Sequence, residues 1–172
     1  GKVEKAVEVA LTVGYKHIDT AWVYGNETEI GTALKKLNIS RDKYFITSKL
    51  WNTMHNPALV VKSLKMSLKN LGLEYLDLYL IHWPMCFEEG NNEGLDPKLP
   101  KNADGTVRFG KIWDIIDTYK AMEKCVELGL TKHIGLSNFN IKQIQIILDN
   151  CTIKPVMNQC ESHPYLPQTE MI

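Results

Sequence analysis

Polar side chains recur at one kind of position in this sequence, the end of a short apolar run. Six of them close five successive runs: Asp19, Lys49, His82, Ser137, Asn138 and Gln159. Each alone is commonly structural, since an aspartate can cap a turn, a lysine can extend to solvent and a histidine can bond a buried carbonyl. Parallel strands bring their C-terminal ends to one edge of a sheet or barrel, where active sites form. The shared position therefore favours a common site.

Tyr24 can complete that site as a proton donor. It lies five residues beyond Asp19, in the loop AWVYGNE, close enough to return over the same edge. Free tyrosine has a pKa of about 10, so it donates a proton poorly at neutral pH unless a nearby cation stabilises its phenolate. Lys49 can supply the cation and Asp19 can hold the lysine charged, while neutral His82 can donate a hydrogen bond to a carbonyl oxygen. The combination suits protonation of an oxygen as hydride reaches the adjacent carbon. Packing within the loop is the alternative role for Tyr24.

Helical and extended patterns alternate along the chain. Apolar residues at helical spacing predict helices, and short continuous apolar runs predict strands. The expected strands cover residues 15–20, 44–50, 76–83, 133–137 and 155–160, and the expected helices cover 3–11, 27–37, 57–71, 112–128 and 141–148. Asn56 is expected to cap the third helix, with Pro57 at its first position. Residues 84–110 form a long polar segment, typical of either a functional flap or a disordered excursion.

This alternation restricts the architecture to two types. Buried parallel strands between amphipathic helices form an open doubly wound sheet or a (β/α) barrel. An open sheet gathers its site at a topological switch point, whereas a barrel takes site residues from successive strands at its mouth. Because five successive strands end in polar residues, we predict an α/β fold of the barrel type. A chain of 172 residues is one domain or part of one.

Composition disfavours several classes of partner. Twenty basic residues balance twenty acidic ones, so no overall field attracts nucleic acid or an anionic membrane surface. No apolar stretch approaches the roughly 20 residues that span a bilayer. The four cysteines form no C-x-x-C pair or disulfide-like framework, which favours reduced thiols. We therefore expect a cytoplasmic protein that binds neither nucleic acid nor membrane.

Five ordered blocks of the sequence resemble the aldo-keto reductase family, most closely its aldehyde reductase and aldose reductase branch. The blocks are GYKHIDTAWVYGNETEIG, FITSKLWNT, LEYLDLYLIHWP, GLSNFN and NQCESHPYL, and the similarity runs through nearly all of the chain. The resemblance implies a partial (β/α)8 TIM barrel over residues 1–172. About five of its eight strands would lie in this chain, with the first strand upstream and the last two downstream.

The resemblance also assigns roles to individual residues. It implies reduction of aldehydes or ketones to alcohols with NADPH, which becomes NADP+, and a catalytic tetrad of Asp19, Tyr24, Lys49 and His82 with Tyr24 as proton donor. Asp19 also matches a cofactor-binding residue of the family. The residues that match those holding the nicotinamide carboxamide are Ser137, Asn138 and Gln159. Besides Tyr24 and His82, the residues matching the lining of the carbonyl-substrate pocket are Trp22, Val23, Trp51, Trp83 and Phe87. Hydroxyl and amide groups suit a carboxamide, and aromatic walls exclude water.

Other cofactor elements of the family match no residue of this chain. These are the tyrosine that stacks on the nicotinamide and the basic cluster that binds the adenosine 2′-phosphate of NADPH. The preference for NADPH therefore rests on the resemblance alone. We expect the full-length protein to be monomeric. The 172 residues alone are expected to be inactive and able to self-associate, because five strands cannot close the barrel.

Two other functions stay open at this point. One is a non-catalytic nicotinamide-binding relative, such as the potassium-channel β subunits or lens crystallins that share the family fold. The other is a metal-dependent barrel hydrolase or isomerase that would use His82, Asp19, Glu161 and His163. The sequence has no H-x-H pair or comparable ligand spacing to support the metal.

Overall fold

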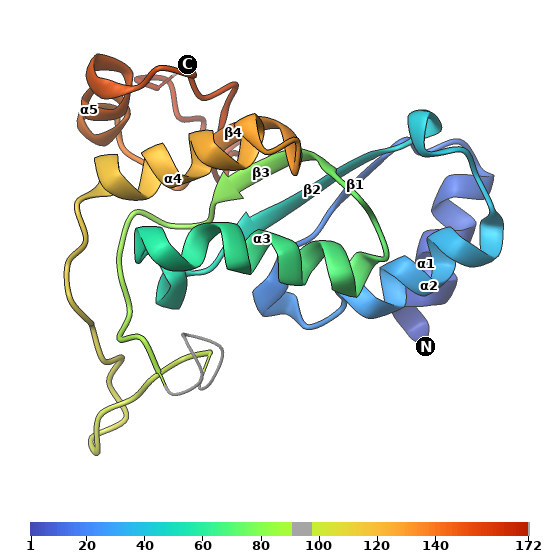
Figure 1. The fold of residues 1–172 in the computed structure, drawn as a ribbon, viewed down its shortest axis with the longest axis horizontal. Coiled ribbons are helices and arrows are strands. Elements are labelled where there is room, and N and C mark those ends of the chain that lie inside the picture. Colours follow the sequence, from blue (N-terminus) through green and yellow to red (C-terminus); the bar gives the residue numbers. More distant parts are fainter. Residues whose placement is uncertain (91–97, 172) are drawn as a thin grey trace.

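Five parallel strands form one sheet in the computed structural model, which describes residues 1–90 and 98–171 (Figure 1). The strands are β1 (His17–Asp19), β2 (Phe45–Leu50), β3 (Leu76–Ile81), β4 (Thr131–Ser137) and β5 (Asn158–Gln159). They are hydrogen-bonded in sequence order, β1-β2-β3-β4-β5, and every pair is parallel. A doubly wound sheet would reverse its strand order at a switch point. The sequential order confirms the predicted partial (β/α) barrel.

In the described residues, five α-helices connect and cover the strands. They are α1 (Lys2–Thr12), α2 (Glu27–Leu37), α3 (Pro57–Leu71), α4 (Ile115–Glu127) and α5 (Ile141–Asn150). Each packs on the next in sequence order, α1 on α2 through to α4 on α5, as in the outer ring of a barrel. Asn56 caps α3 as predicted, since its Oδ1 accepts a hydrogen bond from the Ala58 amide at 3.0 Å. Within the described residues, no helix combines the length and the apolar character that crossing a bilayer requires.

Side-chain alternation divides the sheet into two faces. In the register, Asp19 pairs with Thr47, Lys49 with Leu80, and Ser137 with Gln159. Residues paired in register point to the same side, and their chain neighbours point to the other. The polar residues at the strand ends therefore share the concave face, which becomes the barrel interior.

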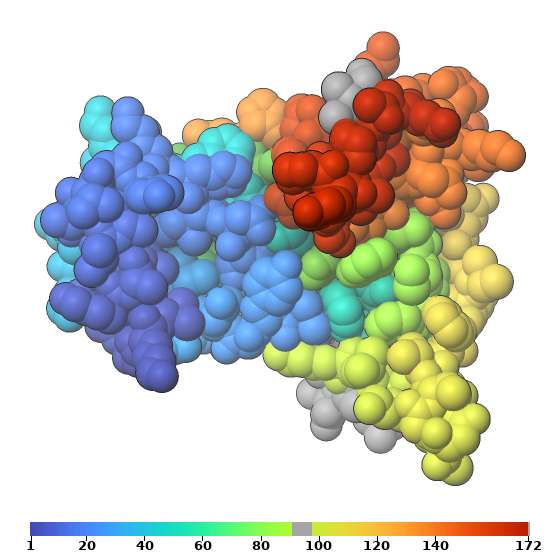
Figure 2. Space-filling view, turned by 180° about the vertical axis from the view of Figure 1, so that it is seen from behind, coloured from blue at the N-terminus to red at the C-terminus, as the bar shows by residue number. Residues whose placement is uncertain are grey.

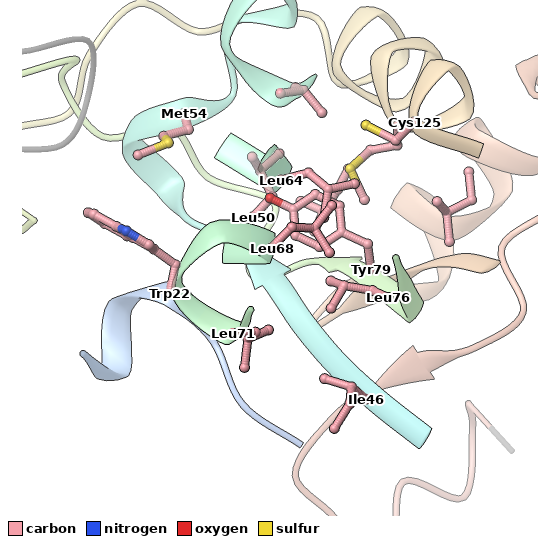
Figure 3. Close-up of a cluster of buried hydrophobic side chains, with 14 of the residues drawn as sticks. Trp22, Ile46, Leu50, Met54, Leu64, Leu68, Leu71, Leu76, Tyr79 and Cys125 are labelled. Atoms are coloured by element: carbon pink, nitrogen blue, oxygen red, sulfur yellow. The ribbon is translucent and has the colours of Figure 1, made fainter. Parts of the chain in front are cut away.

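The opposite face of the sheet forms the core beneath the helices (Figure 3). Ile46, Leu50 and Tyr79 lie there, fully buried against α3 residues such as Leu64. Each leucine buried in this way contributes about 1.5–3 kcal/mol. Tyr79 also satisfies its hydroxyl by donating to Ser63 Oγ at 3.1 Å. The core thus fixes α3 to β2 and β3 and orients the concave face.

The strands at the two edges are shorter than the sequence predicts. β1 covers three residues instead of 15–20, and β5 covers two instead of 155–160. Each has one neighbouring strand within the described residues, so fewer of its residues enter a ladder. α4 starts at Ile115 rather than at residue 112 because Asp114 caps it, its side chain accepting from the Ile116 amide.

The described parts of the 84–110 segment fold back on themselves. Phe87 pairs with Phe109 and Lys101 with Val107 in antiparallel bridges, and the Trp51 indole donates to the Lys98 carbonyl at 2.6 Å. These contacts show that this part of the segment is ordered, which disfavours a disordered excursion, the second of the two alternatives. Residues 91–97 lie outside the described residues. Seen from behind, the N-terminal part of the chain, in blue, and the C-terminal segment, in red, lie on different sides of the molecule (Figure 2).

Candidate active site

Lys49 and Asp19 form an ion pair at the mouth of the partial barrel. Lys49 is only 1% exposed, and its Nζ contacts Asp19 Oδ1 and donates to the Thr20 carbonyl at 2.9 Å. An ammonium group in such a place is costly unless it is paired and hydrogen-bonded. Neighbouring strands supply the two partners, β1 the carboxylate and β2 the lysine, on the same concave face. The pair holds a positive charge in a fixed place.

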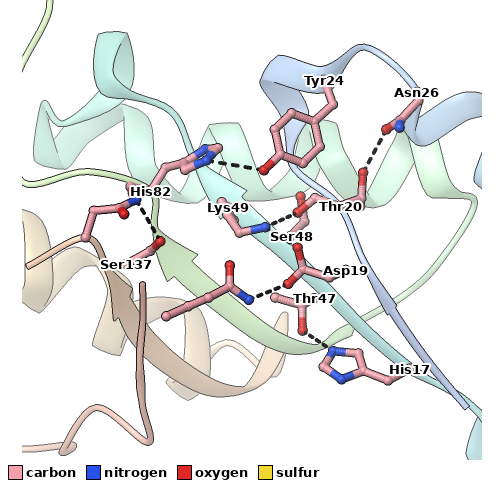
Figure 4. A network of polar contacts seen from close by, with 12 residues as sticks. His17, Asp19, Thr20, Tyr24, Asn26, Thr47, Ser48, Lys49, His82 and Ser137 are labelled. Atoms are coloured by element: carbon pink, nitrogen blue, oxygen red, sulfur yellow. Dashed lines mark hydrogen bonds and ion pairs between the residues drawn. The ribbon is translucent and has the colours of Figure 1, made fainter. Parts of the chain in front are cut away.

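Tyr24 reaches this charge from the loop after β1. The loop contains a short 3-10 helix over Trp22–Tyr24, which ends at Gly25 with φ +70°. Lys49 Nζ lies 5.3 Å from the centroid of the Tyr24 ring, and Tyr24 Oη lies 3.5 Å from His82 Nε2. Figure 4 shows the Tyr24 hydroxyl pointing toward His82, with Lys49 below them and its amine directed at Thr20. At 3.5 Å the hydrogen bond is weak, and both groups face the same space.

His82 is neutral at physiological pH. It follows β3 directly and is buried. Burial lowers its pKa from 6.5 to about 4, and the nearby Lys49 ammonium acts in the same direction while Asp19 opposes it. A neutral imidazole has one donor and one acceptor nitrogen. His82 can therefore donate one hydrogen bond toward the space that Tyr24 also faces.

Ser137, Asn138 and Gln159 join the same network. Asn138 has a φ of +63°, a conformation that asparagine tolerates better than most residues, and its Nδ2 donates to the His82 carbonyl at 3.0 Å and to Ser137 Oγ at 3.1 Å. Gln159 Nε2 donates to Asp19 Oδ2 at 2.8 Å. Since β1 and β5 form opposite edges of the sheet, this last contact shows how far the sheet curls.

The unused groups of these three residues complement a primary carboxamide. The amide nitrogens of Asn138 and Gln159 are engaged, so their oxygens stay available as acceptors, and Ser137 retains its hydroxyl donor. A primary carboxamide presents two N–H donors and one acceptor oxygen. One hydroxyl donor and two amide oxygen acceptors therefore fit the carboxamide of a nicotinamide.

The predicted pocket aromatics separate into two groups. The Trp51 ring packs edge-on against His82, with centroids 5.2 Å apart, and against buried Phe87 at 5.7 Å. Trp22 instead lies under the Lys98 ammonium at 4.7 Å. Trp83 is 38% exposed, and Val23 is half-buried. The structure thus brings Trp51 to His82, places Phe87 against Trp51, and leaves Trp83 at the surface.

The four residues of the metal hypothesis do not form one cluster. Asp19 contacts Lys49 and Gln159, whereas Glu161 Oε1 and His163 Nε2 bond each other at 2.9 Å on an exposed turn. Within the part of the chain that the structure describes, no group of three or more His, Cys, Asp or Glu could hold a metal ion.

Sequence reasoning missed the polar contacts behind the site. These contacts are made by Thr20, Asn26, Glu27 and Ser48. Glu27 among them is almost fully buried. The available signal was weak, because a glutamate at the start of a helix normally faces solvent and favours the helix dipole there.

Comparison with known proteins places these residues in a family. Residues 2–172 match the family model described as the Aldo/keto reductase family. Aldo-keto reductase family 1 member A1 is 51% identical to this chain in Xenopus tropicalis and 49% identical in Homo sapiens, over 177 aligned residues that include all of this chain. The chain spans about half the length of these relatives, 52% and 53%.

Solved structures agree with the sequence comparison. Aldose reductase from Giardia lamblia superposes with a TM-score of 0.92 at 42% identity, covering 98% of this chain and 55% of that one. The aldose reductase from Schistosoma japonicum gives a TM-score of 0.87 at 48% identity, covering 95% and 54%.

Proposed function

Because the chain belongs to the aldo/keto reductase family, we propose that the whole protein reduces aldehydes or ketones to alcohols with NADPH. The observation that carries the proposal is the convergence of Tyr24, Lys49 and His82 on one space, with Asp19 beside the lysine. The names of the relatives, aldo-keto reductase and aldose reductase, support the same reaction class. The preference for NADPH follows the family resemblance.

The chemistry assigns a separate task to each tetrad residue. Tyr24 Oη and His82 Nε2 lie 3.5 Å apart, so a carbonyl oxygen that approaches both can accept a hydrogen bond from each. As the carbonyl carbon is reduced, negative charge develops on this oxygen, and the Tyr24 proton neutralises it. The Lys49 ammonium stabilises the phenolate that Tyr24 leaves behind. Asp19 keeps that ammonium in place.

A reduced nicotinamide, when bound, would supply the hydride. Ser137, Asn138 and Gln159 would hold its carboxamide through one hydroxyl donor and two amide oxygens, and Asp19 lies next to Gln159 on the same side. Trp22, Val23, Trp51, Trp83 and Phe87 are proposed to line the substrate pocket together with Tyr24 and His82. Aromatic walls exclude water, which strengthens each electrostatic contact inside the site.

Carbonyl-dependent oxidation of NADPH by the full-length protein tests the proposal. A panel of aliphatic and aromatic aldehydes should each accelerate the loss of NADPH absorbance, and the alcohol should appear in equal amount. Binding of NADPH without turnover of any carbonyl would contradict it and favour a non-catalytic nicotinamide-binding role.

A further inference from the structure

A buried carboxylate lies directly behind the candidate site, on the helix side of β2. Glu27, the first residue of α2, is 2% exposed. Its carboxylate accepts hydrogen bonds from Ser48 Oγ at 2.8 Å and from Asn70 Nδ2 at 3.0 Å. A carboxylate in such a place is costly unless its lone pairs are satisfied. Glu27 thereby ties the start of α2 both to β2 and to the last turn of α3.

The tie to β2 falls next to the catalytic lysine. Ser48 precedes Lys49, and consecutive side chains of a strand point to opposite faces. Lys49 points to the concave side and Ser48 to the helices, so Glu27 holds β2 from behind the lysine. Tyr24 lies only three residues before Glu27. Any shift of the start of α2 along β2 would therefore move Tyr24 relative to Lys49.

The other end of the Tyr24 loop is tied to the same strand. Lys49 Nζ donates to the Thr20 carbonyl at 2.9 Å, and the Thr20 amide donates to the Thr47 carbonyl at 2.9 Å. Thr20 Oγ1 donates to Asn26 Oδ1 at 2.8 Å and closes the base of the loop (Figure 4). Asn26 occupies the N-cap of α2 without capping it through its side chain. Its amide oxygen serves loop closure instead.

We propose that Glu27 is a positioning residue, whose bond to Ser48 sets the placement of Tyr24 against Lys49. The inference rests on the proposed function, because it takes Tyr24 as the proton donor. Tyr24 itself is 52% exposed, so packing around its ring constrains it little. A misplacement of about 1 Å in a reacting group can cost roughly a hundredfold in rate. The contacts that hold the two ends of the Tyr24 loop on β2, through Glu27 and through Thr20, should therefore affect the turnover rate.

Two alanine variants of the full-length protein form a matched pair. Ser48→Ala and Asn70→Ala each remove one hydrogen bond to the same carboxylate, but only Ser48 links it to the strand of Lys49. Ser48→Ala should lower kcat about tenfold through a partial misplacement of Tyr24, with KM for the carbonyl and Kd for NADPH little changed. Asn70→Ala should leave kcat close to the wild-type value. Glu27→Gln keeps an acceptor for Ser48 and should retain most of kcat, whereas Glu27→Ala should lose it.

Hydrogen exchange supplies a measurement that needs no turnover. Ser48→Ala should speed amide exchange within residues 20–26, and Asn70→Ala should not. Equal kcat for the two variants, or unchanged exchange of this loop in Ser48→Ala, would overturn the inference and leave Glu27 as a packing residue. If the wild-type protein reduces no carbonyl, the proposed function fails, and the exchange comparison still decides whether Glu27 places the loop.

Discussion

At the scale of single residues, burial decides which charges the candidate site can hold. Lys49 is almost fully buried, whereas the Asp19 side chain is 36% exposed. The lysine therefore depends on the aspartate far more than the reverse, because an unpaired buried charge is strongly destabilising. His82 lies beside the same ammonium and avoids a second positive charge by staying neutral. The site therefore holds one fixed cation, the Lys49 ammonium, beside two further hydrogen-bond donors, the Tyr24 hydroxyl and the His82 imidazole.

The neutral state of His82 can be measured by NMR titration of its ring protons. The midpoint should lie near 4, because burial and the Lys49 ammonium lower the pKa from 6.5 to about 4. Unfolding then takes up a proton between these two values, so this histidine makes the protein less stable as pH falls from 6.5 toward 4. The signal is assigned by its loss in His82→Gln. A midpoint at the ordinary value would contradict the role of His82 as a neutral donor.

The positions of the candidate site residues were predictable because these residues interrupt apolar strands at the same end. Asp19, Lys49 and His82 all lie where that pattern placed them. Glu27 and Ser48 were not predictable in the same way. Their importance comes from a contact between residues 21 positions apart, and neither residue type signals such a contact locally.

At the scale of elements, helices with strong end signals were predicted best. The predicted bounds of α2 and α3 agree with the structure. For α3 the end signals are clear, because Asn56 and Pro57 open the helix and Gly72 closes it with φ +67°. The short 3-10 helices over Trp22–Tyr24 and Asn52–Met54 were missed. Three residues are too few to display a hydrophobic period.

A glycine pair tests how the Tyr24 loop is held. Gly25 and Gly72 have φ values of +70° and +67°, so an alanine at either site should cost about 1–2 kcal/mol of folding free energy. A Cβ at Gly25 would also lie 3.4 Å from Lys98 Nζ, whereas one at Gly72 would meet nothing within 4 Å. Both variants should lower the midpoint of denaturant unfolding similarly.

Turnover should separate the two variants. Gly25→Ala is expected to lower kcat because Gly25 follows Tyr24 directly, and Gly72→Ala should not, since Gly72 follows α3 away from the site. Equal turnover of the two variants in the full-length protein would mean that the backbone at Gly25 does not control the position of Tyr24.

At the scale of the whole molecule, the sheet is curled but open. Gln159 on β5 reaches Asp19 on β1, yet within the described residues β1 pairs with β2 alone and β5 with β4 alone. Large apolar side chains are exposed near these edges, among them Tyr15 and Val156. The alternation of helices and strands predicted this architecture, whereas the lengths of the edge strands depend on neighbours that the pattern does not reveal.

These 172 residues, expressed alone, should self-associate and fail to bind NADPH tightly. Unpaired strand edges and exposed apolar surface favour pairing with another copy. For the cofactor, the described site offers only the groups that we propose bind the nicotinamide carboxamide. Light scattering gives the solution mass, and quenching of tryptophan fluorescence reports NADPH binding. A monomer with a cooperative thermal transition and tight NADPH binding would contradict this expectation.

The most direct test of the account is the turnover of Tyr24→Phe in the full-length protein. This substitution deletes only the phenolic hydroxyl, which lies 3.5 Å from His82 Nε2, and keeps the ring beside Lys49. Loss of a positioned general acid typically costs about 10²–10⁴-fold in rate, so kcat should fall by roughly that factor, while Kd for NADPH, measured by fluorescence quenching, should stay close to the wild-type value. Turnover near the wild-type rate, with NADPH bound equally well, would show that another group delivers the proton.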